Sequence, residues 1–158
     1  MTGAPVMIRV VVNGRDRVFE IAPHALLLDV VRDLLDLKGA KRSCDTQVCG
    51  ACTMLVDGLA VSACTYLAIE ADGRSVLTVE GLADGESLHP LQQAFVDAGA
   101  VQCGFCTSGM LLTARAMLAE NQKPTRDDVL HYLRGSLCRC TGYRKIVDAI
   151  LAAAEDAR

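Results

Sequence analysis

The sequence predicts an α+β chain in two blocks, with a strand-rich first half and an all-helical second half. In the first half, short apolar stretches alternate with turn residues, as expected for strands. From Pro90 onward, apolar residues recur at helical spacing instead. The change falls near Gly81–Gly85, so we expect two domains, at residues 1–82 and 83–158.

Five strands are expected in the first block, at residues 7–12, 17–21, 54–56, 59–61 and 76–79. The first two flank a turn at 13–16, and Asp72-Gly73 precedes the last. Asp57-Gly58 between the middle pair is a strong signal for a two-residue hairpin, because Gly accepts the positive φ that a type I′ turn requires.

One helix is expected between these strands and four after them. Residues 26–37 carry Leu and Val at helical spacing, and Lys38-Gly39 ends that segment. Pro90 suits a first helical position, and Thr125 suits a helix cap. The four later helices are expected at residues 90–98, from 107 or 108 onward, at 125–135 and at 143–154.

Composition excludes several classes of protein. Of the 158 residues, 51% are hydrophobic but only 4% are aromatic and none is Trp, so the core must be mainly aliphatic. A net charge of −3 with mixed signs gives no nucleic-acid footprint. The apolar runs are too short to cross a bilayer. Without a basic region or twin arginine at the N-terminus, a signal peptide is not expected, and we expect a cytoplasmic protein.

The first cysteine group is Cys44, Cys49, Cys52 and Cys64, spaced C-x4-C-x2-C-x11-C. Its first three spacings match plant-type [2Fe–2S] ferredoxins. Three thiolates on one loop wrap the cluster from one side, and Cys64, which follows the Asp57-Gly58 hairpin, closes it from a neighbouring element. Zinc is the alternative, although the x4 gap is unusual for zinc knuckles. Disulfides fit poorly, because grouped cysteines in a reducing cytosol are more often metal ligands.

The second group is Cys103, Cys106, Cys138 and Cys140, in a C-x2-C and a C-x-C pair. Each pair precedes an expected helix, and a helix N-terminus suits an anionic cluster. Spacing alone leaves zinc open at this group. It also leaves open a site that mixes the two groups and a redox-active disulfide.

Three cysteine motifs follow one another along the chain: CDTQVCGACT at residues 44–53, QCGFCTSG at 102–109 and CRCTGY at 138–143. Together they resemble the small iron–sulfur subunit of the molybdenum hydroxylases, the xanthine oxidase family that includes the aerobic carbon monoxide dehydrogenases. The resemblance runs from about Met7 to Ala152. It implies a β-grasp, plant-type ferredoxin-like domain followed by a four-helix-bundle [2Fe–2S] domain.

The resemblance also implies what each cysteine group holds. The outer [2Fe–2S] cluster, nearer a flavin, would be held by Cys44, Cys49, Cys52 and Cys64. The inner [2Fe–2S] cluster, nearer a molybdenum–pterin cofactor, would be held by Cys103, Cys106, Cys138 and Cys140. Gln102 and Cys140 stand at the positions that lie against the pterin in relatives.

The implied function is electron transfer between the molybdenum–pterin site and FAD in a hydroxylase or dehydrogenase. A large subunit would supply the molybdenum–pterin cofactor and a medium subunit FAD, in a hetero-oligomer for which a dimer of heterotrimers is one arrangement. No residue of this chain is expected to act on substrate. N-heteroaromatic compounds, purines, aldehydes and carbon monoxide all remain open as substrates.

Four residues depart from the family pattern: Ser43, Asp45, Gln47 and Ser136. The first three stand around and between the first two cysteines, where many relatives have Gly. Asp45 adds a negative charge beside the first cluster, which would lower its potential if unscreened, and Ser136 replaces a common Asn near the second. Two other functions stay open beside the electron-transfer subunit: a stand-alone iron–sulfur sensor or carrier, and a structural zinc protein.

Overall fold

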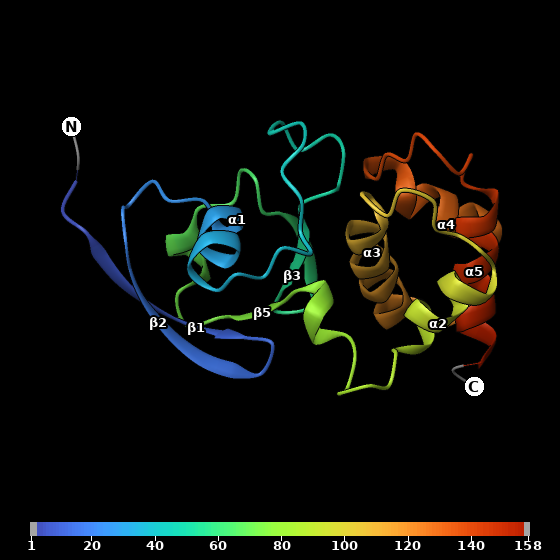
Figure 1. Cartoon of the computed structure of the whole chain (residues 1–158), viewed down its shortest axis with the longest axis horizontal. Helices are drawn as coiled ribbons and strands as arrows, with labels where there is room; N and C mark the ends of the chain where they lie inside the picture. Colours follow the sequence, from blue (N-terminus) through green and yellow to red (C-terminus); the bar gives the residue numbers. More distant parts are fainter. Residues whose placement is uncertain (1–2, 157–158) are drawn as a thin grey trace.

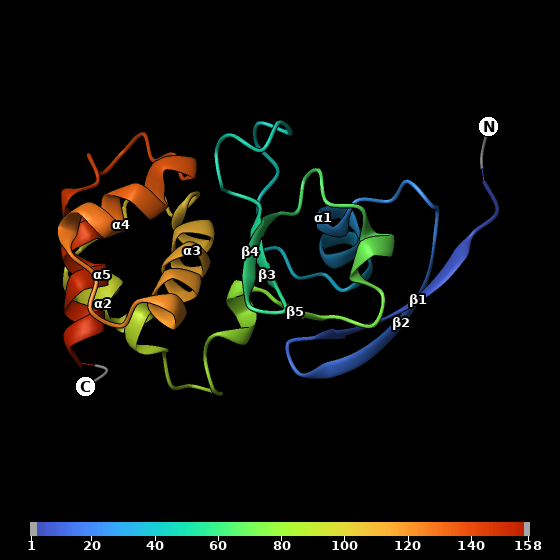
Figure 2. The ribbon, with the colours of Figure 1, turned by 180° about the vertical axis from the view of Figure 1, so that it is seen from behind.

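A computed structural model describes residues 3–156 of the chain, which form two lobes side by side. One lobe holds the sheet with a short helix on it, and the other holds the helices of the second half of the chain. The strand-rich first half and the helical second half thus lie at opposite ends of the molecule (Figures 1 and 2). The order of the two blocks is the one predicted from the sequence.

The first lobe is built on a five-stranded mixed sheet with the order β2-β1-β5-β3-β4. The strands are β1 Val6–Val12, β2 Arg15–Ile21, β3 Thr53–Val56, β4 Leu59–Ser62 and β5 Ser75–Leu77. Of the strand pairs that the structure describes, β1–β5 alone is parallel. The β3–β4 hairpin has the expected two-residue turn, because Val56 pairs with Leu59 and both turn residues have positive φ.

Two strand boundaries differ from the prediction. Strand β2 begins at Arg15, not at 17, because the turn consists of only Asn13 and Gly14, both at positive φ. Strand β5 ends at Leu77, not at 79. The chain turns away there because the Thr78 N–H donates to the Asn13 side chain, and a 3₁₀ turn at Val79–Gly81 follows.

The helix on the sheet is shorter than predicted. Helix α1 covers Leu27–Asp29 and continues as a π-helical turn at Val30–Leu34, so the predicted end at residue 37 was wrong. Asp36 has a φ of 56°, which no right-handed helix contains. The apolar periodicity continues to residue 37 because Leu35 and Leu37 still pack against the core of this lobe.

The second lobe contains α2 Pro90–Asp97, α3 Thr107–Glu120, α4 Arg126–Tyr132 and α5 Arg144–Asp156. A 3₁₀ turn at Leu133–Gly135 extends α4 to the predicted end. Two capping boxes start the shorter helices, one through His89 at α2 and one through Thr125 at α4. None of the helices described over residues 3–156 is long and apolar enough to span a membrane.

The two lobes meet where α3 packs on strands β3 and β4 (Figure 1). The contact is backbone against backbone, since a Cβ on Gly109 would meet the Gly50 carbonyl group. A Cβ on Gly50 would in turn meet the Gly135 carbonyl oxygen and Ser136. A hydrogen bond of 2.9 Å from the Leu137 N–H to the Cys49 carbonyl oxygen fixes the same joint. The loop with the first cysteine group is therefore held against the loop with the second.

Candidate metal centres

The first cysteine group lies on the loop that precedes β3 and just after β4. Cys44 and Cys49 are partly exposed on the loop, whereas Cys52 and Cys64 are buried. The hairpin pairs Thr53 with Ser62, which brings Cys64 back beside Cys52 as the sequence analysis expected.

The thiols of this first group differ widely in pKa. The pKa of Cys44 is lowered to about 6, mainly by the Thr46 backbone N–H, which donates to its sulfur over 3.5 Å. Burial raises the pKa of Cys52 to about 12. A thiol that is neutral in the free protein and buried in this way needs a positive ion to become a thiolate, as a metal site provides.

The second cysteine group converges on one cavity between the α3 and α5 N-termini. The cavity has a volume of about 500 Å³. All four cysteines line it, and the sulfurs of Cys103 and Cys140 are 3.5 Å apart. Cys49 of the first group lines the same cavity. The two groups are thus neighbours in space although they lie in different lobes.

Hydrogen bonds order the loop that carries Cys138. Its sulfur lies 3.0 Å from the Thr141 hydroxyl and 3.4 Å from the Thr141 N–H. Burial opposes ionisation, but these contacts prevail and lower the pKa of the Cys138 thiol. The Tyr143 hydroxyl accepts from the Cys138 N–H and donates to the Ser136 carbonyl oxygen, so its hydrogen bonds tie both ends of this loop segment together.

Of the two predicted pterin-facing residues, Cys140 lines this cavity, and Gln102 directly precedes Cys103, which also lines it. Gln102, Cys103 and Cys140 are exposed. Cys106 is less accessible, and burial raises its thiol pKa to about 12. Phe105 and Leu137, both large apolar residues, are about half exposed at the rim. The mouth therefore combines thiols with an uncovered apolar border.

Two family models match the chain. One is described as a 2Fe-2S iron-sulfur cluster binding domain and matches residues 10–85. The other is described as a [2Fe-2S] binding domain and matches residues 78–151. Each model therefore covers one lobe and one cysteine group.

Curated relatives match over nearly the whole chain. The nicotine 6-hydroxylase small subunit of Paenarthrobacter nicotinovorans is 50% identical over 148 residues, which are 94% of this chain and 89% of that protein. The xanthine dehydrogenase iron–sulfur-binding subunit of Escherichia coli O157:H7 is 43% identical over 148 residues, 92% of each chain. The chain belongs to the small iron–sulfur subunits of the molybdenum hydroxylases. Among solved structures, quinoline 2-oxidoreductase from Pseudomonas putida 86 matches with a TM-score of 0.94 and 49% identity, over 99% of this chain and 98% of that one.

As a member of this family, the chain is the iron–sulfur subunit of an oxidoreductase complex, with a ferredoxin-like [2Fe–2S] domain followed by a helical [2Fe–2S]-binding domain. Its donor set fits such clusters: all eight cysteines are free thiols in two groups of four. No histidine is among the described residues that line the cavity of the second group, and His89 caps helix α2.

Three contributors to the sites were missed by the sequence reasoning. Thr141 lies inside the CRCTGY motif, but nothing in the spacing shows that its hydroxyl reaches the Cys138 sulfur. The close approach of Gly109 to Gly50 also has no signal except that both are glycines in cysteine motifs. Finally, Arg42 forms ion pairs with Asp29 and Asp45, so the Asp45 charge is compensated and not left unscreened.

Proposed function

We propose that this subunit relays electrons between a molybdenum–pterin site and FAD through two [2Fe–2S] clusters. One observation carries the proposal: Cys49 of the first group lines the cavity formed by the second group. An electron relay requires that its two redox centres lie close together, whereas two unrelated structural metal sites have no need to be neighbours. When bound, each cluster supplies one-electron transfer.

In this proposal the chain contributes ligation, shielding and hydrogen bonds. The outer cluster is held by Cys44, Cys49, Cys52 and Cys64, and the inner cluster by Cys103, Cys106, Cys138 and Cys140. The backbone N–H groups of Thr46 and Thr141 donate hydrogen bonds to the sulfurs of Cys44 and Cys138, which stabilises negative charge there. The exposed mouth at Gln102 and Cys140 is the surface that we assign to the molybdenum–pterin subunit.

The same proposal extends to the domains and the assembly. Residues 1–82 form a β-grasp domain and residues 83–158 a four-helix bundle made of α2 to α5. A large molybdenum–pterin subunit and a medium FAD subunit complete a cytoplasmic hetero-oligomer. A dimer of heterotrimers is one arrangement of such an assembly. The relatives are small subunits of dehydrogenase and hydroxylase complexes, which supports an assembly over a stand-alone carrier.

Metal analysis of the purified complex tests the function. We expect four irons and four sulfides per copy of this chain, and two distinct [2Fe–2S] signals in electron paramagnetic resonance after reduction. Stoichiometric zinc without iron would refute the proposal. A chain that purifies alone from its native source would instead favour the sensor or carrier.

A pair of variants tests the order of the clusters. Cys140→Ser should disturb the signal that is magnetically coupled to Mo(V), and Cys64→Ser should disturb the uncoupled one. If the two variants gave the opposite pattern, the inner and outer assignments would have to be exchanged.

A further inference from the structure

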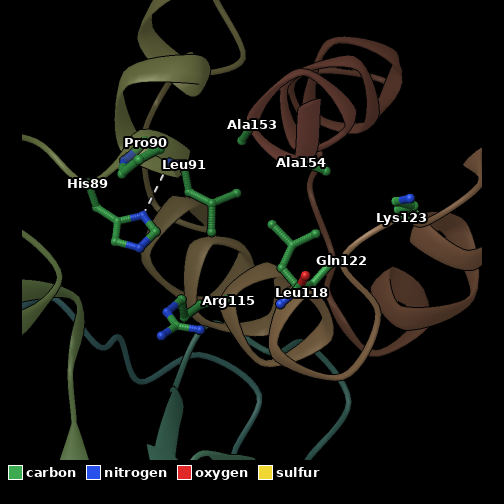
Figure 3. A pocket seen from close by; sticks show the side chains of 9 residues that line it. All are labelled: His89, Pro90, Leu91, Arg115, Leu118, Gln122, Lys123, Ala153 and Ala154. Carbon is green, nitrogen blue, oxygen red and sulfur yellow. Dashed lines mark hydrogen bonds between the residues drawn. The ribbon is translucent and has the colours of Figure 1, made fainter. Parts of the chain in front are cut away.

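A second cavity, of about 460 Å³, opens on the helical lobe away from both cysteine groups. It lies between the N-terminus of α2, the C-terminal half of α3 and the end of α5 (Figure 3). Nothing in the proposed electron transfer uses it. Its lining divides into an apolar centre and two charged ends, and we refer to it as the α2–α3–α5 groove.

The centre of the α2–α3–α5 groove is aliphatic. Leu91 from α2 and Leu118 from α3 point toward each other across it, and Ala153 and Ala154 of α5 form its far wall (Figure 3). Apolar surface continues outside the groove, because Leu88, next to His89, is 47% exposed. An occupant that covers both areas must be larger than a small anion.

The two ends of the groove are positively charged. Arg115 lies beside His89 at one end, and Lys123 lies at the other (Figure 3). Neither side chain takes part in a hydrogen bond or ion pair within residues 3–156. Among the described residues that line the groove, none is Asp or Glu.

His89 does not compensate these charges, since it is itself held neutral. Its Nδ1 accepts the Leu91 N–H over 3.2 Å, which requires an unprotonated ring nitrogen. Burial, and next the charge of Arg115, lower its pKa. The groove therefore presents uncompensated positive charge around an apolar floor, the complement of an acidic, apolar chain segment.

We propose that the α2–α3–α5 groove receives an acidic segment of a partner subunit, which places one carboxylate at Arg115, another at Lys123 and an apolar side chain between Leu91 and Leu118. The inference rests on the proposed function only in requiring that the chain work as one subunit of a complex. Arginine is the cation that best suits such a partly buried carboxylate pair. This contact would hold the helical lobe at a site separate from the mouth of the cysteine cavity.

The test uses the intact complex with Arg115→Glu in this chain. We expect this subunit to dissociate at least about tenfold more readily, because the reversed charge repels the carboxylate that the pair needs. Arg115→Lys keeps the charge and should weaken binding only about threefold. Iron content and both cluster signals should be unchanged in each variant, which separates this test from that of the clusters.

Arg17→Glu on β2 is the matched control, since it makes the same charge change on an exposed residue in the other lobe. It should leave the dissociation constant unchanged. Equal weakening by Arg115→Glu and Arg17→Glu, or no weakening by Arg115→Glu, would overturn the proposal.

Chemical cross-linking identifies the occupant directly. A carbodiimide joins an amine to a carboxylate that touches it, so Lys123 should become linked to an Asp or Glu of a partner subunit, as read by mass spectrometry. Links from Lys123 only to carboxylates of this chain would overturn the proposal, as would protection of Lys123 by a small anion in the isolated subunit.

Discussion

Substitution of Gly109 tests whether the two lobes are joined by direct backbone contact. A Cβ built on Gly109 would lie 3.0 Å from the Gly50 carbonyl carbon and 3.4 Å from the Ala51 Cα, with the Gly50 carbonyl oxygen closer still. Carbon atoms in contact prefer about 3.5–4.0 Å, so α3 must move by about 0.5–1 Å or more. Neither neighbour can rotate away, because both are backbone.

The expected cost of Gly109→Ala follows from two opposing effects. Overpacking of a rigid site costs about 1–3 kcal/mol, and this site belongs at the upper end. Replacing Gly by Ala inside a helix returns about 1 kcal/mol. We therefore expect a loss of about 2 kcal/mol in the free energy of unfolding, equivalent to a fall of about 4–8 °C in Tm for a chain of this size.

Circular dichroism during thermal and urea unfolding measures this loss, and hydrogen exchange at the Leu137 amide reports on the joint itself. Gly135→Ala is the control, because a Cβ there has no neighbour within 4 Å. It should change stability by less than about 0.5 kcal/mol. Helix propensity alone predicts that Gly109→Ala raises Tm. If that were the result, the argument for close backbone packing between α3 and the Gly50 loop would fail.

Three further predictions concern hydrogen bonds and charge. Thr141→Val removes the hydroxyl next to the Cys138 sulfur and should lower the potential of one cluster by about 20–40 mV in a redox titration. This shift is the equivalent of a hydrogen bond of about 0.5–1 kcal/mol. Thr141→Ser should restore the potential, and an unchanged potential in Thr141→Val would contradict the assignment. Folding lowers the pKa of His89, mainly through burial and next through the nearby charge of Arg115. The neutral imidazole therefore contributes to the free energy of unfolding above about pH 6.5, and this contribution is lost as the pH falls below that value. His89→Asn, a cap that does not titrate, should flatten the dependence of Tm on pH between about 7.5 and 5.5; an identical pH profile would show that the cap is not the cause. The Ser75 N–H lowers the pKa of Asp57, so its contribution is present above about pH 4 and is lost as the pH falls through the lowered value. Asp57→Asn should therefore make acid unfolding less steep in circular dichroism, and a transition as steep as in the parent would argue against this role.

Local signals in the sequence were sufficient where the structure depends on neighbouring residues. Asp57-Gly58 predicted the hairpin, and the hairpin places Cys64 beside Cys52. Pro90 and Thr125 marked the starts of two helices correctly. These features follow from the conformational preferences of two to four consecutive residues.

Features that depend on distant residues could not be predicted. Gly50 and Gly109 are far apart in the sequence, and only the packed fold shows that both must lack a side chain. Arg42 carries no sequence signal for its pairing with Asp29 across the loop. The end of α1 was misjudged for a related reason, since Leu37 keeps the helical spacing while packing from outside the helix.

The joint between the lobes also has a consequence for how the protein is made. Gly50 is at a φ of 69° within the loop that carries three cysteines, and α3 packs directly on that residue. Helix α3 therefore finds its docking surface only after the loop has taken its final shape, which a bound metal would impose. Maturation of the first site and docking of the second lobe become one step, so a chain that fails to receive its first cluster would leave α3 undocked and open to proteolysis.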